Sequence, residues 1–218
     1  LRNPIGTIAM SVYNLRNKTD DENLFGHLDK IETKVEESNR IIEDLLFYSR
    51  LRPPELKDVR VGELLKEIVE EARRNFPSKE YDLVLETDGM EGLSIEADPL
   101  QLREVLVNVI DNAGDAVAEA GREGRIEVKA HPDDGSVVIC VRDNGPGIKK
   151  GHIDKIFDPF FTTKTRGTGL GLAICRQIVV NHEGSIEIDS GSGEDSGTSV
   201  TVRLPLTMPK RDLENRVL

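Results

Sequence analysis

The sequence predicts an α+β protein in two parts: an N-terminal helical hairpin and a larger α/β sandwich with a mixed, largely antiparallel sheet. An apolar heptad pattern runs through residues 24–49, Pro53 and Pro54 interrupt the chain after it, and helix-like and strand-like patterns follow in turn. A heptad pattern is typical of helices that pack side by side, and strands joined by short turns are typical of antiparallel sheets. We therefore expect a hairpin domain over residues 1–54, a sandwich domain over 55–208 and a charged tail over 209–218.

The hairpin prediction depends on two helical patterns separated by a polar break at residues 17–21. Pro4 stands where the first turn of a helix tolerates proline, and apolar residues follow it at helical spacing. Asp20 or Asp21 can cap the second helix, which we expect to run to about residue 52. Its apolar seam consists of Leu24, Leu28, Ile31, Val35, Ser38, Ile42, Leu45 and Ser49.

A hairpin with one apolar seam on each helix cannot cover itself. The pattern therefore predicts a homodimer in which the two hairpins form a four-helix bundle. The alternative is a hairpin that packs only on the second domain of its own chain.

Composition excludes some classes of partner. Lys and Arg number 29 against 40 Asp and Glu, for a net charge of −11, whereas nucleic acids and anionic membrane surfaces attract basic proteins. No apolar stretch reaches the about 18 residues of a membrane span, and no secretory signal opens the chain. We expect a cytoplasmic protein, attached to a membrane only through segments upstream of Leu1. Cys140 and Cys175 are expected to be buried and reduced.

Beyond Pro54 the chain alternates between helices and strands. Asp98 and Pro99 form a cap followed by a proline at the first helical position, which predicts the start of a helix. Asp133, Asp134 and Gly135 predict the turn of a β-hairpin. Helices are expected over 61–76, 99–120 and 168–181, and strands over 81–87, 93–97, 125–130, 136–141, 185–189 and 199–204.

Two glycine clusters predict a nucleotide site. The first, residues 143–148, joins the Asp143 carboxylate to glycines that allow the backbone to approach a ligand closely. The second, residues 167–172, places three glycines where a helix begins, so that free amide groups and the helix dipole face an anion. A carboxylate for the base and a cradle for the phosphates, joined by a mobile segment over residues 149–166, are the parts of a nucleotide site.

The helix expected over residues 99–120 carries a polar face formed by Gln101, Glu104, Asn108, Asn112 and Asp115. Asn is a poor residue in the middle of a helix, so two of them one turn apart indicate a function. Mg²⁺ prefers hard oxygen ligands, and nucleotide sites supply only one or two of them from protein. The alternative is a polar face that is only solvated.

Four motifs in this order resemble the N, G1, F and G2 boxes of sensor histidine kinases. They lie at residues 108–113, 143–147, 157–164 and 167–172. Residues 1–5 are similar to the end of that family's phosphoacceptor box, His-Glu-Leu-Arg-Asn-Pro-Leu. The resemblance implies a dimerisation and histidine-phosphotransfer hairpin, followed by an ATP-binding domain of the Bergerat type, which gyrase, a heat-shock chaperone and a mismatch-repair ATPase share.

The resemblance also implies roles for single residues. Asn112 would hold Mg²⁺, Asp143 would accept a hydrogen bond from the exocyclic amine of adenine, and Lys164 would lie near the terminal phosphate. Asn3, Asn108 and Lys164 are the implied catalytic residues, Asn3 by orienting water for dephosphorylation of a response regulator. The other implied ATP and ADP contacts are Asn108, Asp115, Gly145, Gly147, Ile148, Phe157, Thr163, Gly167, Thr168, Gly169, Leu170, Gly171, Leu172 and Thr198.

In this family the phosphoacceptor histidine would stand two positions before Leu1, and none of His27, His131, His152 and His182 is expected to replace it. The implied function is transfer of the γ-phosphoryl group of ATP to that histidine and then to an aspartate in the receiver domain of a response regulator. One alternative is a regulatory ATP-binding scaffold without phosphotransfer. Another is a gyrase-type ATPase, but such enzymes usually carry glutamate at the position of Asn108.

Overall fold

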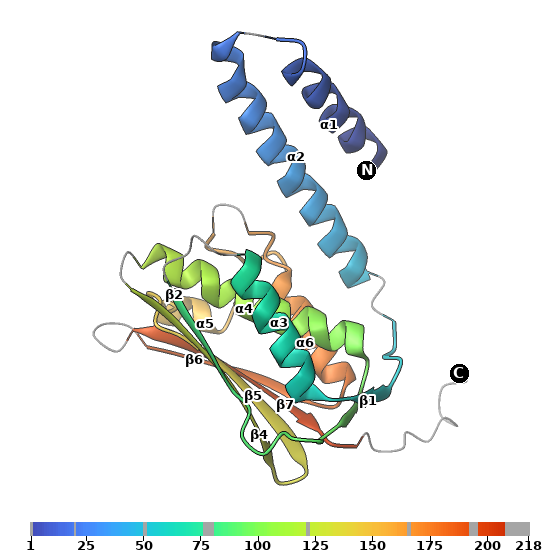
Figure 1. Cartoon of the computed structure of the whole chain (residues 1–218), viewed down its shortest axis with the longest axis vertical. Helices are drawn as coiled ribbons and strands as arrows, with labels where there is room; N and C mark the ends of the chain where they lie inside the picture. Colours follow the sequence, from blue (N-terminus) through green and yellow to red (C-terminus); the bar gives the residue numbers. More distant parts are fainter. Residues whose placement is uncertain are drawn as a thin grey trace. The chain divides into compact units, whose positions relative to one another are not determined.

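The computed structural model describes residues 2–19, 21–49, 52–75, 81–120, 123–164, 167–191 and 196–207 (Figure 1). It divides the chain into two compact units. The first comprises Leu1–Leu51 with Asp158–Gly171, and the second comprises Arg52–Phe157 with Leu172–Leu218. The expected domain boundary after residue 54 stays a prediction, and the expected tail over 209–218 lies outside the described residues.

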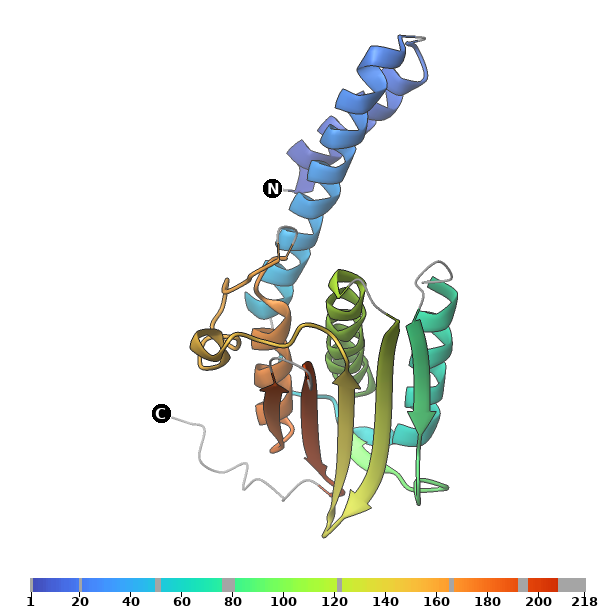
Figure 2. The same cartoon turned by 90° about the vertical axis from the view of Figure 1, so that its left-hand side faces the viewer.

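The first unit contains α1 (Arg2–Arg16) and α2 (Glu22–Ser49), which run antiparallel (Figures 1 and 2). Asp21 caps α2, because its Oδ1 accepts a hydrogen bond of 2.9 Å from the Asn23 amide; the other candidate cap, Asp20, lies outside the described residues. Arg16 of α1 forms ion pairs with Asp29 and Glu32 of α2. These contacts fix the pairing of the two helices.

The apolar seam of α2 is only partly covered within one chain. Leu28 and Ile42 are buried, as is Val12 of α1. Other apolar side chains of the two helices remain between 38% and 56% exposed: Ile8, Leu15, Leu24, Ile31, Ile41 and Leu45. The four-helix bundle that the sequence predicts for a dimer stays a prediction.

The second unit is built on a mixed five-stranded sheet in the order β2-β4-β5-β7-β6. Only the β2–β4 pair is parallel, which confirms the largely antiparallel sheet. The strands are β2 (Tyr81–Glu86), β4 (Gly124–Asp133), β5 (Ser136–Asp143), β6 (Ser185–Gly191) and β7 (Gly197–Pro205). A separate pair joins β1 (Lys57–Val59) to β3 (Ile95–Ala97); β1 and the short helix α5 (Lys150–Ile153) were not predicted from the sequence.

Helices α3 (Val61–Asn75), α4 (Pro99–Glu119) and α6 (Gly171–Asn181) cover one face of the sheet (Figures 1 and 2). The apolar residues of α4 that recur at helical spacing are buried: Leu102, Val105, Leu106, Val109, Ala113 and Val117. Strand residues that alternate with exposed positions complete the core, among them Ile126, Val128, Ile139 and Val141. The core therefore lies between one layer of helices and one face of the sheet.

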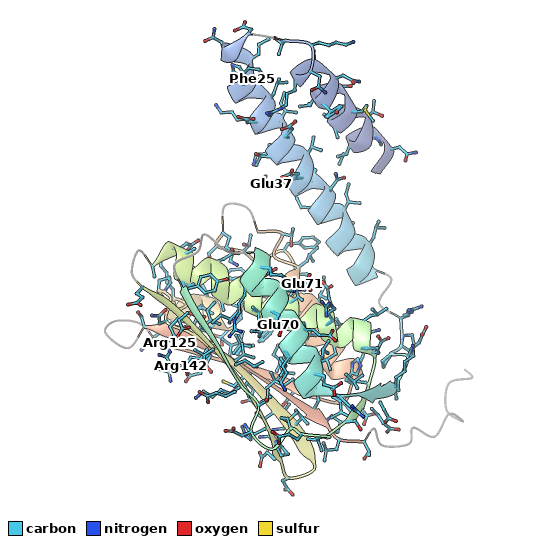
Figure 3. The ribbon with its side chains drawn as sticks, viewed as in Figure 1. Phe25, Glu37, Glu70, Glu71, Arg125 and Arg142 are labelled. Carbon is cyan, nitrogen blue, oxygen red and sulfur yellow. The ribbon has the colours of Figure 1, made fainter. Side chains whose placement is uncertain are left out.

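The other face of the sheet is polar. Arg125 and Arg142 are exposed there (Figure 3), and Lys129 forms an ion pair of 2.9 Å with Glu86 of the adjacent β2. In the described part of the chain, no helix combines the length and the apolar character that crossing a membrane requires.

The turn between β4 and β5 confirms the predicted hairpin. Asp133 pairs with Ser136, and the two residues between them, Asp134 and Gly135, have φ of 40° and 75°. Positive φ at both positions is typical of the type I′ turn, which matches the twist of the flanking strands. Both strands are longer than the sequence predicted.

A buried carboxylate joins the start of α4 to the chain that follows the first unit. Asp98 is 3% exposed, and its Oδ1 accepts hydrogen bonds of 3.0 and 3.2 Å from the amides of Leu100 and Gln101. Its Oδ2 accepts one of 3.0 Å from the Glu55 amide. Desolvation raises the pKa of Asp98, but these backbone hydrogen bonds outweigh it, and the net pKa is lowered.

His182 lies beside this cap and is 2% exposed. Its Nε2 accepts a hydrogen bond of 3.0 Å from the Asp98 amide, so the ring proton is on Nδ1, which donates to the carbonyl of Ile178 at 2.8 Å. The buried ring therefore connects the end of α6 to the cap of α4.

The two cysteines differ from each other. Cys175 is fully buried, and burial raises the pKa of its thiol. Cys140 is only half-buried, so the expectation that both cysteines are buried was wrong for this one. The reason is that side chains alternate between the two faces of β5, and Cys140 is on the face away from the helices. Both thiols are free.

Candidate functional site

Asp143 is the last residue of β5 and is only 6% exposed. Its Oδ1 accepts hydrogen bonds from the Gly145 amide at 2.8 Å and from the Thr198 amide at 3.2 Å. Asp143 also pairs with Thr198 in the register of β5 and β7. A buried carboxylate with fixed backbone donors has a defined orientation, as recognition of a base requires.

The loop that follows Asp143 packs too closely for side chains at its glycines. A Cβ on Gly145 would lie 2.8 Å from the Cβ of Ala116 in α4, one turn beyond Asn112. Gly147 has φ of 75°, and a Cβ there would lie 2.1 Å from the carbonyl oxygen of Gly191 in β6. The two glycines therefore allow the loop to pack against α4 on one side and β6 on the other. Their close approach to a ligand stays a prediction.

Two further side chains hold this loop and were not singled out from the sequence. The Asn144 side chain accepts from the Arg125 amide at 2.8 Å and donates to the Glu123 carbonyl at 3.0 Å. Ser190 Oγ accepts from the Ile148 amide at 2.7 Å. Ser190 could be identified only from its place opposite Thr198 in the sheet. That place is known only once β6 is paired with β7.

The polar face of α4 supplies amide oxygens. Asn108 donates both hydrogen bonds of its Nδ2 to Glu104, to the carbonyl at 3.0 Å and to the carboxylate at 2.9 Å. Its Oδ1 is thereby turned away from Glu104. Asn112, one turn further along, is half-buried. Two amide oxygens on one face, beside the glycine loop at Ala116, fit the hard oxygen ligands of Mg²⁺.

Two members of the predicted polar face behave differently. Gln101 is buried, at 5% exposed, and its Nε2 donates to the Arg52 carbonyl at 3.0 Å, so it belongs to the core rather than to the ligand face. Asp115 is exposed. The pKa of Tyr81 in β2 is raised by burial and by the nearby charges of Asp111 and Asp115, so Asp115 lies close enough to act on that strand.

Phe157, the first aromatic residue of the third motif, is half-buried. The guanidinium of Arg176 in α6 lies over its ring, 5.6 Å from the centroid, within the range of a cation–π interaction. This contact fixes the point where the chain leaves the second unit.

Residues 158–164 and 167–170 belong to the first unit, and a backbone hydrogen bond joins these two segments. The Phe160 amide donates to the Gly169 carbonyl at 2.9 Å, and both residues have positive φ, 68° and 69°. A Cβ on Gly169 would lie 2.4 Å from the Phe160 carbonyl carbon. Phe160 itself is 62% exposed. Gly169 is therefore required by the backbone, whatever it contributes to a ligand.

The predicted site residues divide between the two units. In the second unit, the predicted residues of α4 and of the loop after Asp143 lie together with Thr198. The first unit contains the glycine-rich loop and Asn3, which is exposed on α1. The second unit contains Asn108, Asn112, Asp115, Asp143, Gly145, Gly147, Ile148, Phe157, Leu172 and Thr198, and the first contains Asn3, Thr163, Lys164, Gly167, Thr168, Gly169, Leu170 and Gly171. Their ligand contacts stay predictions.

The known proteins that this chain resembles include histidine kinases. The signal transduction histidine-protein kinase AtoS of Escherichia coli (strain K12) is 34% identical over 206 residues, which cover 94% of this chain and 33% of AtoS. The catalytic domain of the histidine kinase ThkA is similar in structure, with a TM-score of 0.62 and 34% identity, over 70% of this chain and 97% of that domain. ThkA in complex with the response regulator protein TrrA gives a TM-score of 0.70 and 31% identity, over 96% of this chain and 60% of that one.

The chain spans about a third of the length of AtoS and of the sensor histidine kinase ZraS from the same strain. A family model described as histidine kinase-, DNA gyrase B-, and HSP90-like ATPase matches residues 97–208, which include α4, the Asp143 loop and Thr198. This match covers just over half of the chain. The protein therefore belongs to the histidine kinase-, DNA gyrase B- and HSP90-like ATPase family, and its relatives AtoS and ZraS are named histidine kinases.

Proposed function

We propose that this chain is the ATP-binding and phosphotransfer part of a sensor histidine kinase. The observation that carries the proposal is the buried Asp143 carboxylate, which is held by the amides of Gly145 and Thr198 beside a loop packed on α4. A fixed acceptor in an enclosed position suits the exocyclic amine of adenine. The relatives support the same class of protein, since they are named histidine kinases.

In this proposal each group of the site has one task. Asp143 accepts from the adenine amine, Gly145 and Gly147 leave room for the base, and Ile148 and Thr198 line its pocket. Asn112 holds Mg²⁺, with Asn108 supporting the phosphates. When bound, Mg²⁺ supplies charge neutralisation between the phosphate groups of ATP. The amides of residues 167–171, with Lys164, hold the phosphates near the start of α6.

The proposed transfer needs no protein nucleophile in the ATP-binding domain. An imidazole nitrogen forms a bond to the γ-phosphorus as the bond to the β–γ bridging oxygen breaks, ADP leaves, and the imidazole proton passes to solvent. A receiver-domain aspartate of a response regulator then takes the phosphoryl group from the histidine. In the family's box the histidine stands two positions before Leu1, and Asn3, four positions after it, orients water for dephosphorylation of the regulator.

We propose a homodimer through α1 and α2 with residues 1–54 as the phosphotransfer domain and residues 55–208 as the catalytic domain. The cytoplasm is the proposed location, because ATP and response regulators are found there. ThkA was solved in complex with a response regulator, and a receiver domain is the proposed macromolecular partner here.

A single variant tests the proposal with two measurements. Calorimetry with Mg-ADP should give binding that Asp143→Asn weakens at least about 10-fold, because the variant keeps the shape of the side chain and removes a charged acceptor worth about 1.5–3 kcal/mol. A chain extended by His-Glu before Leu1 should take an acid-labile, base-stable label from γ-labelled ATP, and Asp143→Asn should slow this labelling.

The two measurements separate the alternatives. Undiminished ADP affinity in Asp143→Asn would contradict the adenine assignment. Normal ADP binding without labelling of the extended chain would favour the ATP-binding scaffold. Release of inorganic phosphate from ATP without any label on the protein would favour the gyrase-type ATPase.

A further inference from the structure

Ser190 makes three hydrogen bonds through one hydroxyl group, and the proposed function assigns it no role. Its Oγ lies 2.7 Å from the Ile148 amide nitrogen, 3.0 Å from the Gly197 carbonyl oxygen and 3.2 Å from the Thr198 hydroxyl oxygen. The side chain is half-buried. It therefore connects the loop after Asp143 to the start of β7.

The chemistry of the three partners determines where each proton lies. A serine hydroxyl has one proton to donate and two lone pairs that accept. The Gly197 carbonyl can only accept, so it receives the Ser190 proton, and the Ile148 amide can only donate, so it uses one lone pair. The remaining contact, with Thr198, must then be a hydrogen bond that the Thr198 hydroxyl donates to Ser190.

This assignment fixes the character of Thr198. Because its single hydroxyl proton is directed at Ser190, Thr198 Oγ1 offers only lone pairs to any other group. Thr198 pairs with Asp143 on one side and with Ser190 on the other in the register of the sheet. The three side chains therefore share one row across β5, β7 and β6. The site presents two acceptors next to each other, the Asp143 carboxylate and the Thr198 hydroxyl oxygen.

We propose that Ser190 is a positioning residue that sets the base specificity of this site, an inference that rests on the proposed adenine-nucleotide function. The amino group of a 6-amino purine can donate to the two acceptors, the Asp143 carboxylate and Thr198 Oγ1. The carbonyl oxygen of a 6-oxo purine only accepts, so it would face the lone pairs of these two groups without a hydrogen bond. Sites built to hydrogen-bond one group reject the analogue that lacks it, because buried polar groups are then left unpaired. By holding the Thr198 proton, Ser190 prevents Thr198 from turning to donate to a 6-oxo group.

The experiment compares the affinities of ADP and IDP, which differ at the 6-position of the purine. The unaltered chain should bind ADP more tightly than IDP. Ser190→Ala frees the Thr198 hydroxyl to rotate and should reduce the ADP/IDP affinity ratio about 3- to 10-fold, the effect of about one hydrogen bond. Thr198→Val, which removes the oxygen and keeps the shape, should reduce the ratio similarly. Ser199→Ala is the matched control, because Ser199 follows Thr198 in β7 and lies on the opposite face of the strand. It should leave the ADP/IDP affinity ratio unchanged.

The ratio distinguishes a specificity role from a structural one. If Ser190→Ala lowers both affinities by the same factor, the inference is overturned and Ser190 only packs the loop. If the Ser199 control moves the ratio as much as Ser190→Ala does, the inference is also overturned. If the unaltered chain binds neither nucleotide, the proposed function itself fails, and that result differs from ADP binding with an unaltered ratio.

Discussion

Asp98 connects three separate backbone amides through one buried carboxylate, those of Glu55, Leu100 and Gln101. We predict that Asp98→Ala lowers the free energy of unfolding by about 1–3 kcal/mol at pH 7, since a helix cap is lost and buried amides lose their acceptor. Urea denaturation of the full chain measures this difference. Asp58→Ala, at an exposed position of β1, serves as the matched control and should change little.

The same carboxylate gives a pH dependence of known sign. Because folding lowers the pKa of Asp98, its stabilising contribution is complete above the unfolded pKa of about 3.9 and is lost as the pH falls through the lower folded value. The difference between the unaltered chain and Asp98→Ala should therefore shrink between pH 5 and pH 2. A difference that stays constant over this range would contradict the role of the ionised carboxylate.

Single residues also show where sequence reasoning stops. Asp143, Gly145 and Gly147 could be identified because their residue types and spacing are themselves the signal. Ser190 could not be, because an isolated serine in a strand carries no signal until β6 is placed beside β7. Gln101 was assigned to a polar face from its spacing alone, yet the backbone at Arg52 covers it. Helical periodicity cannot predict which side chains a distant segment of the chain will bury.

At the scale of elements, the segment over residues 149–166, of which 149–164 are described, is predicted to act as a lid over bound nucleotide. The Phe160 amide in this segment donates a hydrogen bond to Gly169, which follows it in the chain. The exposed Phe160 side chain offers an apolar group that can dock. Hydrogen exchange of the amides at 162–164 and 167–169 should slow when Mg-ADP binds. Exchange that is the same with and without nucleotide would exclude this segment from the site.

The elements themselves could be predicted where their patterns were long. The helices over 61–75 and 99–119 and the β4–β5 hairpin follow from apolar periodicity, a proline-containing cap and an Asp-Gly turn. Strand β1 and helix α5 were missed because three and four residues are too few for a period to be visible. The existence of β1 also depends on a partner distant in the sequence, since Lys57 pairs with Ala97.

For the whole molecule, we predict a homodimer through the first unit. Ile31 lies on the heptad seam and is 41% exposed in one chain, so Ile31→Glu should place a charge in the bundle and shift the protein from dimer to monomer in sedimentation. Met10→Glu is the matched control and should remain dimeric, because Met10 is 60% exposed and is not one of the apolar residues that follow Pro4 at helical spacing, Ile5, Ile8, Val12 and Leu15. A monomeric unaltered chain at micromolar concentration would argue against the bundle.

The order of the sheet has a consequence for how molecules meet one another. β2 and β6 are the outermost strands of the sheet. Among the described residues, no further strand pairs with the outer side of either one, which is where another chain can add as a strand. Both carry acidic residues at exposed positions, Asp82 on β2 and Glu187 and Asp189 on β6. Strands of two molecules that approached side by side would bring like charges together. The acidic edges therefore oppose the growth of the sheet from one molecule to the next.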